Sequence, residues 1–577
     1  MCGLALLLFS CNGGKGKLRA PVKLNGKYGY IDENDNMVID AVYDEAWSFI
    51  RGSAIVKKEN KWGMIDKYGD ELTKMEFDSI IPFSEHCCIY LIDSLFGFLE
   101  QGTGKRITEP AYDHVFYYTV ELCAVQKGHS LGLVNNFGKI VCPPVVQDIR
   151  EMIGPGAIIV EQDTTDEVTM LLSLIQGGGS SRLGLINRKG EIIMKPAYDE
   201  IFDDLANGFY YPFMRDPDVK ADTLEPGSPQ LMIGLYGIAD TTGKLLADVQ
   251  FEEMPVYGDG LFRVMKNKKY GFADAKGKMV IPAEWDYAVA FSEGKAIVVK
   301  GNQASIINKQ GKILAGNLGS GAGLYRFNAG LARCRAEDGR YGFLDETGKR
   351  VIPVQFDAAD DFDPEDKVAI VSKNDQYGLI NTSGEFVVNP EYEFIFNLGD
   401  GYYQVKHEDG GTGVVDKTGK KILNTDYDEV FLLQKNLFTV EKDMLTGCYD
   451  ASGKEIFPPV SITNIFFLNG RSEVSKDGKF GMIDTTGKFI IPAQYDSIGY
   501  HYKGYTIVMN NNKFGAVDSL GHTVIPEKFQ ELRPFLNGYA VFRENDKFGF
   551  VNLKGEVVIP AKYEDAGVLV DPDRQHY

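Results

Sequence analysis

The chain has 577 residues, of which 44% are hydrophobic, 12% aromatic and 25% charged, a composition that excludes wholesale disorder. Its formal net charge of −20 excludes nucleic acid as a main partner, because phosphate backbones are bound by basic surfaces. The same negative charge disfavours direct contact with anionic membrane surfaces.

The chain begins with an apolar run, MCGLALLLFS, that is too short to cross a bilayer, which takes about 20 apolar residues. It resembles the end of a signal peptide, and Leu8–Cys11 resembles the lipobox of bacterial lipoproteins, in which a small residue precedes the lipidated cysteine. We therefore expect a lipid on Cys11, a signal remnant at 1–10 and a tether at 11–22. No Lys or Arg precedes the apolar run, so we expect the true start of the signal to lie upstream.

One phrase recurs from Tyr28 to Glu564, and it is clearest at Lys479–Ile498, KFGMIDTTGKFIIPAQYDSI. Fifteen copies align on the glycine after an aromatic residue, and most successive spacings are 34 to 37 residues. The aligned positions are Gly29, Gly63, Gly97, Gly132, Gly184, Gly237, Gly271, Ser305, Gly342, Gly378, Gly413, Gly447, Gly481, Gly515 and Gly549. The residues that define the repeat most clearly are Tyr28, Gly29, Trp62, Gly63, Tyr270, Gly271, Tyr341, Gly342, Phe480, Gly481, Phe514, Gly515, Phe548 and Gly549.

Two spacings, of 52 and 53 residues, exceed the period and predict inserted loops. We place the inserts near Gln162–Ser181 and Tyr210–Gln230, both polar or rich in Gly and Pro. A third irregular stretch adjoins the degenerate eighth copy, where Ala304 and Ser305 replace the aromatic residue and the glycine. The predicted organisation is copies 1–4 at 23–160, an insert at 161–182, copy 5 at 183–209, an insert at 210–232, copies 6–8 at 233–314, an irregular connector at 315–335, copies 9–15 at 336–570 and a tail at 571–577.

The residue pattern within each copy predicts β-strands. In Lys61–Asp66 the alternation places Trp62 and Met64 on one face. An Asp-x-x-Gly-Lys turn follows in many copies, where the Asp can cap the turn and Gly supplies positive φ. The next strand contains Ile-Pro, and proline ends regular pairing or lies at a sheet edge. A Tyr-Asp pair then precedes a third strand, and we expect this pair to tie one copy to the next.

The sequence therefore predicts an all-β chain of about fifteen three-stranded units. We expect an elongated or curved solenoid, because three short strands bury a core only by stacking on neighbouring copies. Two β-propellers are the alternative, although 34 residues is short for a four-stranded blade.

The phrase KWGMID at Lys61–Asp66, with its Gly turn and the later Ile-Pro and Tyr-Asp, resembles the WG-repeat family of bacterial proteins. The resemblance covers roughly Lys27 to Glu564, and most copies have Tyr or Phe in place of Trp. It implies an exported or interaction protein and transfers no catalytic residue. The fourth, eighth and twelfth copies depart most from the pattern.

We find no catalytic, cofactor-binding or metal-ligating set in the sequence. Each turn has a single Asp, whereas a calcium loop concentrates several oxygen ligands. The acidic stretch Asp357–Asp366 is interpreted as a solvated loop. The seven histidines form no ligand pair, and His86-Cys87-Cys88 shows no sign of thiol activation. Gly319–Gly323 lacks the Lys-Ser/Thr of a phosphate-binding loop.

The eight cysteines are interpreted as mostly buried free thiols. A few disulfides are the alternative if the protein is exported. Some of the 30 Tyr and 35 Phe are expected in grooves, where rings can stack on sugars or hold a peptide. Our first hypothesis is a non-enzymatic scaffold at the bacterial cell envelope that binds protein or glycan and touches the membrane only through a lipid on Cys11. A glycan-active repeat enzyme and a purely structural envelope spacer are the alternatives. We expect functional residues where the phrase breaks, at the two inserts, the eighth copy and the N-terminal cysteine.

Overall fold

A computed structural model describes residues 18–117, 122–146, 148–153, 157–163, 181–187, 192–204, 206–216, 233–319, 323–434 and 436–574. Within these ranges the regular structure is β-strand, which confirms the all-β prediction. The described strands form fifteen small antiparallel sheets, as many as the predicted copies. Twelve of these sheets have four strands and three have three. Among the described residues, no helix is long and apolar enough to cross a membrane.

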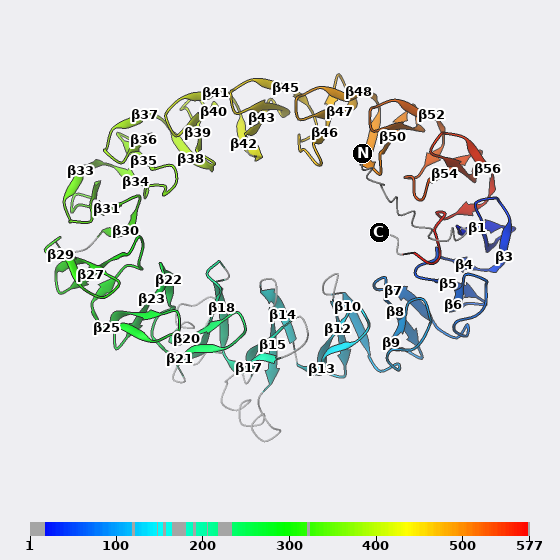
Figure 1. Ribbon diagram of the computed structural model, residues 1–577, viewed down its shortest axis with the longest axis horizontal. Helices are drawn as coiled ribbons and strands as arrows, with labels where there is room; N and C mark the ends of the chain where they lie inside the picture. Colours follow the sequence, from blue (N-terminus) through cyan, green and yellow to red (C-terminus); the bar gives the residue numbers. More distant parts are fainter. Residues whose placement is uncertain are drawn as a thin grey trace, which may run out of the picture. The chain divides into compact units, whose positions relative to one another are not determined.

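The chain divides into two compact units. The first is Met1–Val145 with Gly470–Asp484 and Lys488–Tyr577, and the second is Val146–Asn469 with Thr485–Gly487. The strands that begin in the first unit are β1 (Ala20–Leu24), β2 (Lys27–Ile31), β3 (Met37–Tyr43); β4 (Glu45–Ala46), β5 (Ser53–Lys58), β6 (Lys61–Asp66); β7 (Ser79–Pro82), β8 (Cys87–Ile92), β9 (Leu95–Glu100); β10 (His114–Tyr117), β11 (Leu122–Lys127), β12 (Ser130–Asn135), β13 (Ile140–Val146); β46 (Arg471–Lys476), β47 (Lys479–Asp484), β48 (Phe489–Tyr495); β49 (Ser497–Tyr502), β50 (Tyr505–Asn510), β51 (Lys513–Asp518), β52 (Thr523–Phe529); β53 (Glu531–Leu532), β54 (Tyr539–Glu544), β55 (Lys547–Asn552), β56 (Val557–Tyr563) and β57 (Asp565–Ala566) (Figure 1).

The strands of the second unit are β14 (Asp148–Ile153), β15 (Ala157–Asp163), β16 (Ser181–Asn187), β17 (Ile192–Tyr198); β18 (Glu200–Asp204), β19 (Phe209–Arg215), β20 (Gly234–Asp240), β21 (Leu245–Phe251); β22 (Val256–Gly258), β23 (Leu261–Lys266), β24 (Lys269–Asp274), β25 (Met279–Trp285); β26 (Tyr287–Ala288), β27 (Lys295–Lys300), β28 (Gln303–Asn308), β29 (Ile313–Ala315); β30 (Leu324–Asn328), β31 (Leu331–Arg335), β32 (Tyr341–Leu344), β33 (Arg350–Phe356); β34 (Ala358–Ala359), β35 (Val368–Lys373), β36 (Gln376–Asn381), β37 (Phe386–Tyr392); β38 (Phe394–Gly399), β39 (Tyr402–Lys406), β40 (Thr412–Asp416), β41 (Lys421–Tyr427); β42 (Glu429–Gln434), β43 (Leu437–Lys442), β44 (Leu445–Asp450) and β45 (Glu455–Ser461).

In each four-stranded sheet but the first, the chain runs back and forth through four consecutive strands. The turn between the second and third strands is short: Asn267 and Lys268, between β23 and β24, both have positive φ, of 52° and 57°. This is the geometry of the two-residue type I′ turn, whose twist matches that of paired strands. Because the turn takes only two residues, four strands fit into 34. The predicted count of three strands was therefore wrong for these sheets; it missed the short first strand after Tyr-Asp, such as β26.

The aromatic–glycine pair lies on the strand that precedes the Ile-Pro strand, which is the third strand in most sheets, such as β24. Tyr270 pairs with Trp285 and Phe272 with Ile281, so the fourth strand bulges opposite Gly271. A Cβ atom on Gly271 would lie 2.7 Å from the carbonyl oxygen of Ile281, which explains why this position needs glycine. The same approach to the backbone of the fourth strand occurs at Gly29, Gly342, Gly481, Gly515 and Gly549, whereas Gly63 faces the side chain of Met75.

The Asp-x-x-Gly-Lys turn has the capping role predicted for it. In the seventh copy the Asp274 carboxylate accepts hydrogen bonds from the backbone N–H groups of Lys276 and Lys278, at 2.9 and 3.0 Å. Gly277 has a φ of +77°, and a Cβ atom there would overlap the carbonyl oxygen of Leu246 in the preceding copy. The turn glycine therefore serves both the local conformation and the close stacking of two copies.

The Tyr-Asp pair links neighbouring copies, as predicted. Asp286 forms an ion pair with Lys269 of its own copy and accepts a hydrogen bond of 2.7 Å from the backbone N–H of Gly301 in the next. The ring before the acid is buried; Tyr495, for example, packs with Ile498 and Val508 of the following copy. The equivalent acids that accept from a turn N–H in the next copy include Asp44, Asp78, Asp113, Asp357, Asp428 and Asp496.

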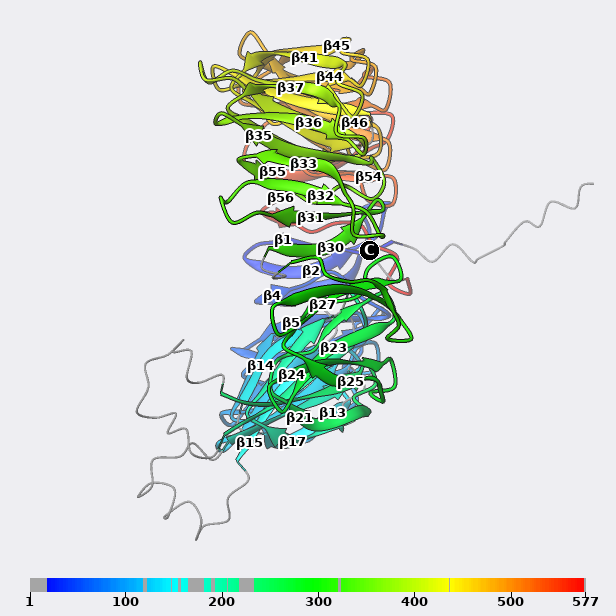
Figure 2. The same cartoon turned by 90° about the vertical axis from the view of Figure 1, so that its left-hand side faces the viewer.

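The core lies between successive sheets. Buried apolar side chains of β31–β33, such as Phe343 and Ile352, pack with Ala369 and Val371 of β35. Figure 2 shows the strands of these two copies stacked on one another. The core clusters of the described residues join successive copies, which confirms the expectation that stacking buries the apolar residues.

The first sheet contains the last strand of the chain. β57 pairs antiparallel with β1, so the order of this sheet is β3-β2-β1-β57, and Val22 lies opposite Ala566. An open solenoid leaves its first and last repeats apart, so the solenoid prediction was wrong. Four-stranded meanders are the blades of β-propellers, so the repeating unit is of the kind that the propeller alternative implies. The described sheets show one such long-range closure, which does not support two separately closed propellers.

Several predicted boundaries differ from the structure. β1 begins at Ala20, inside the segment expected as a tether, because Ala20 and Val22 are buried in the closing sheet. β19 continues to Arg215, so the second insert starts later than 210, and β30 and β31 occupy 324–335 of the expected connector. Residues 164–180, 217–232 and 1–17, with Cys11, lie outside the described residues. The described cysteines are free and buried, as predicted: Cys87, Cys88, Cys123, Cys142, Cys334 and Cys448.

Candidate functional site

The strand after the degenerate eighth copy has an irregular pairing. In β30, Leu324 lies opposite Cys334 and Phe327 opposite Ala332, so two residues are accommodated in a bulge between them. Those two residues are Tyr325 and Arg326. Bulges re-aim side chains and are common beside functional sites. The strand thereby presents an aromatic ring and a guanidinium group at its bulge. The first strands β14, β38, β42 and β49 of other copies also have register shifts.

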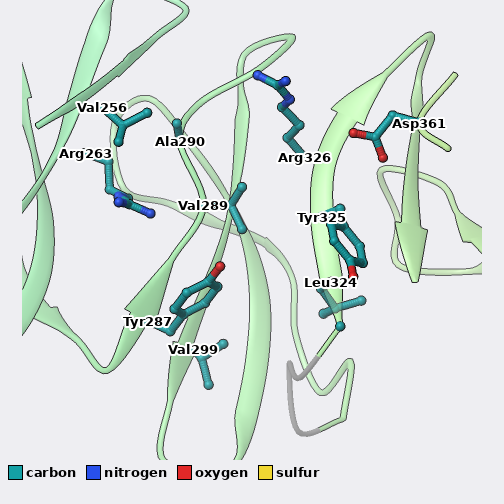
Figure 3. A pocket seen from close by; sticks show the side chains of 11 residues that line it. Val256, Arg263, Tyr287, Val289, Ala290, Val299, Leu324, Tyr325, Arg326 and Asp361 are labelled. Atoms are coloured by element: carbon teal, nitrogen blue, oxygen red, sulfur yellow. The ribbon is translucent and has the colours of Figure 1, made fainter. Parts of the chain in front are cut away.

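A cavity of about 680 Å³ lies beside this bulge (Figure 3). We call it the Tyr287–Tyr325 pocket. Its apolar surface includes Val299 and Leu324, which are both buried, and Val289. The other lining residues are Val256, Arg263, Ala290, Gly323, Arg326 and Asp361. An apolar surface with a few polar groups is the usual composition of a small-molecule site.

Each of the two tyrosine rings is in contact with another side chain of the protein. The guanidinium carbon of Arg333 lies 4.0 Å from the centroid of the Tyr325 ring, and Arg333 also donates a hydrogen bond to the carbonyl oxygen of Ala359. Tyr270 contacts the Tyr287 ring edge to face, with centroids 5.9 Å apart. These contacts restrict the two rings while leaving surface free, since Tyr287 is 45% exposed.

The charged residues that line the pocket differ in whether they have an ion-pair partner. Asp361 Oδ1 lies 3.1 Å from Arg333 Nε, and burial raises the pKa of Asp361 while Arg333 and Arg326 oppose that rise. Arg263 Nη2 lies 3.6 Å from Glu253 Oε2. Arg326 is exposed and has no carboxylate within 4 Å in the described part of the chain. The pocket therefore has one guanidinium group available for a ligand, on a chain whose net charge is −20.

A second hollow, of about 770 Å³, shares Gly323, Leu324 and Tyr325 with the pocket. It opens onto the turn that contains Glu337 and Asp338. Asp338 is ion-paired with Arg340 at 2.6 Å on the same exposed turn. Because this hollow has no second aromatic wall, we place the candidate site in the Tyr287–Tyr325 pocket.

None of the repeat-defining residues lines the pocket; they lie in the strands that precede the Ile-Pro strands. The pocket lies beside the eighth copy, where the phrase breaks. That functional residues lie at such breaks stays a prediction. The acidic stretch Asp357–Asp366 contributes Asp361, although the sequence indicated only a solvated loop. Sequence reasoning missed Arg263, Tyr287 and Tyr325. The one available signal was Tyr325-Arg326, directly after the irregular glycine-rich stretch.

The fold defines a repeat protein of small stacked β-sheets, and a pocket lies beside its irregular eighth copy. The family model of the WG containing repeat matches eleven segments: 28–62, 62–93, 184–214, 236–270, 270–303, 341–377, 377–410, 413–443, 480–514, 514–548 and 548–571. The chain belongs to this family. The copies aligned on Gly97, Gly132, Ser305 and Gly447 are not matched, which agrees with the prediction that the fourth, eighth and twelfth depart most and adds the third.

No curated protein matches the chain. Among solved structures, the computationally designed Ika8 protein is 13% identical, with 44% of this chain and 91% of that one covered and a TM-score of 0.19. PorZ, a surface component of the type-IX secretion system of Porphyromonas gingivalis, is 9% identical, with 93% and 84% covered and a TM-score of 0.19. TM-scores this low carry no argument about fold or function.

Proposed function

We propose that this protein is a non-enzymatic repeat scaffold of the bacterial cell envelope that binds a glycan in the Tyr287–Tyr325 pocket. The observation that carries the proposal is the pair of restrained tyrosine rings beside an apolar surface, with Arg326 and Asp361 among the lining residues. The C–H face of a sugar ring can pack on a tyrosine ring, as other apolar groups do. Its hydroxyl groups can then exchange hydrogen bonds with the guanidinium and carboxylate groups.

The non-enzymatic part of the proposal has its own support. Glycoside hydrolysis generally uses two carboxyl groups on opposite sides of the scissile bond, about 5 to 9 Å apart. The residues that line the pocket include one carboxyl group, that of Asp361, which is already beside Arg333. This arrangement favours binding over hydrolysis.

A glycan array followed by calorimetry tests the proposal. The wild-type chain is expected to bind at least one glycan, and Tyr325→Ala is expected to weaken that binding about tenfold, the loss of one stacked ring and its ordered contacts. Tyr68→Ala is the matched control, because Tyr68 is an exposed turn residue of the second copy, 70% exposed. The proposal fails if no glycan binds, or if the two variants bind equally well. Release of free sugar from a bound glycan would contradict the non-enzymatic part.

The envelope location rests on the lipobox-like Leu8–Cys11, which lies outside the described residues. Metabolic labelling with a lipid precursor tests it. We expect labelled protein from the wild-type gene and none from Cys11→Ala. Equal labelling of the two would contradict a lipid anchor at this cysteine.

A further inference from the structure

A separate cavity, of about 410 Å³, lies in the first unit among the second, third and fourth copies. The third and fourth copies are two of those that the family model does not match. Its lining includes Arg51, His86, Lys105, Phe137 and Lys139. The excess of positive groups is unexpected on a chain with a net charge of −20.

The turn that contains Lys105 departs from the repeat. In the second copy the backbone N–H of Asp66 donates to the carbonyl oxygen of Asp70, four residues on. In the third copy Glu100 N–H donates to Lys105, five residues on. The turn therefore holds one extra residue, and this insertion displaces the lysine that follows the turn glycine.

The wall of the cavity is fixed by a buried amide. The Gln101 side chain donates hydrogen bonds to the carbonyl oxygen of Ile50, at 3.1 Å, and to Ser53 Oγ, at 2.7 Å. The backbone N–H of Gln101 donates to the carbonyl oxygen of His86 at 2.9 Å. Gln101 is only 5% exposed, so these bonds hold the second and third copies in a fixed relation beside the cavity.

Three cations that line this cavity have no carboxylate partner among the described residues. Arg51 donates a hydrogen bond of 2.9 Å to His86 Nδ1, which places the histidine proton on Nε2, 3.1 Å from Glu85. Arg51, Lys105 and Lys139 have no carboxylate within 4 Å in the described ranges. Arg106, in contrast, is paired with both Glu76 and Glu109.

The cavity also has an aromatic wall. The Phe137 ring is stacked on His86, with centroids 4.2 Å apart and an angle of 24° between the planes. The single lining carboxylate, Glu100, accepts a hydrogen bond of 2.6 Å from the hydroxyl of Thr103. Three cations without a carboxylate partner, beside a flat apolar wall, suit a compact dianion attached to a ring or chain.

We propose that this cavity binds a phosphate monoester through Arg51, Lys105 and Lys139. A phosphate group has a charge of about −1.5 to −2 at pH 7 and three acceptor oxygens, which match three cationic donors better than a single carboxylate does. The group attached to the phosphate packs on Phe137. Such a ligand is either a soluble sugar phosphate or the phosphate headgroup of a lipid, and the experiment below separates the two.

Calorimetry of the full chain with inorganic phosphate, glucose 6-phosphate and glucose gives the first arm. Flotation with phosphatidylcholine vesicles, with and without phosphatidic acid, gives the second. The variant is Lys105→Ala with Lys139→Ala, and both positions are exposed, so folding is not at risk. The matched control is Lys278→Ala with Lys312→Ala, two exposed lysines that also follow a turn glycine.

We expect glucose 6-phosphate to bind, glucose not to bind, and the cavity variant to weaken phosphate binding about tenfold or more while the control pair does not. If the protein floats only with vesicles that contain phosphatidic acid, and the cavity variant alone loses this flotation, the ligand is a lipid headgroup. The proposal is overturned if neither phosphate source binds, or if the control pair weakens binding as much as the cavity variant.

Discussion

Glu564, in the last copy, accepts a hydrogen bond of 3.0 Å from the backbone N–H of Gly26 in the first. This is the bond that Asp286 makes to Gly301 between two internal copies, with Glu in place of Asp. The last copy therefore contacts the first as any copy contacts the next. The closure follows from the repeat itself, and β57 adds the missing strand to the first sheet.

The strand closure predicts a specific disulfide. Val22 and Ala566 face each other in the β1–β57 pair, so Val22→Cys combined with Ala566→Cys places two thiols within bonding reach. After mild oxidation, peptide mapping by mass spectrometry should recover the linked peptides. Each single variant is the control. Absence of the link in the folded double variant would indicate that the chain ends do not pair.

The turn glycines predict a graded loss of stability. Gly521 has a φ of +82°, and a Cβ atom there would overlap the carbonyl oxygen of Ile490 in the preceding copy. Gly504 has a φ of +91° but no atom within 4 Å of the added Cβ. Gly504→Ala should cost about 1 kcal/mol from backbone strain alone, and Gly521→Ala about 2 kcal/mol or more. Urea denaturation measures both, and equal losses would contradict the role of this glycine in stacking.

The Tyr-Asp acids predict a loss of stability in acid. The hydrogen bond from Lys479 lowers the pKa of Asp496, and the bond from Lys27 does the same for Asp44. A carboxyl group whose pKa is lower in the folded than in the unfolded chain adds to the free energy of unfolding. This stabilisation is fully present at pH values above the unfolded pKa of about 3.9, and it is lost as the pH falls through the folded pKa.

The measurement is the urea midpoint of wild type and Asp496→Asn at pH 7 and at pH 3. We expect the variant to be less stable at pH 7 and the difference to shrink at pH 3. A difference that is unchanged between the two pH values would show that the charge of Asp496 is unimportant.

The buried cysteines predict unreactive thiols. Burial raises the pKa of Cys87 and Cys448 to about 11, so few thiolates exist at pH 8. With Cys2 and Cys11 replaced by Ser, the native protein should not react with Ellman's reagent, and six thiols should react after unfolding in guanidinium. Rapid reaction of the native protein would contradict the burial described for them.

Much of the fold could be predicted because the repeat shows its constraints fifteen times. The turn Asp and the Tyr-Asp link are local rules with a clear physical reason, and the structure agrees with both. The missed feature was the first strand. In several copies it has only two residues, as in β26, and shows no alternation, whereas β38 and β42 have six residues and were missed as well. The closure by β57 depends on contacts between residues more than 500 positions apart, which no local pattern reports.

The sites were harder to predict, because they are made of residues that do not recur. Arg263, Tyr287 and Tyr325 come from three different copies, and each is unremarkable in its own segment. The sequence indicated only the neighbourhood, through the loss of the aromatic–glycine pair at the eighth copy. The displaced Lys105 left a still weaker signal, a spacing of 35 residues instead of 34 between Gly97 and Gly132.

Hydrogen–deuterium exchange of the full chain, with and without a glycan selected on the array, tests the central claim most directly. We predict that the bound glycan slows exchange in peptides covering 285–290 and 323–328, and that Tyr325→Ala abolishes this effect. Slowed exchange elsewhere, with none in these two segments, would contradict the assignment of the binding site to the Tyr287–Tyr325 pocket.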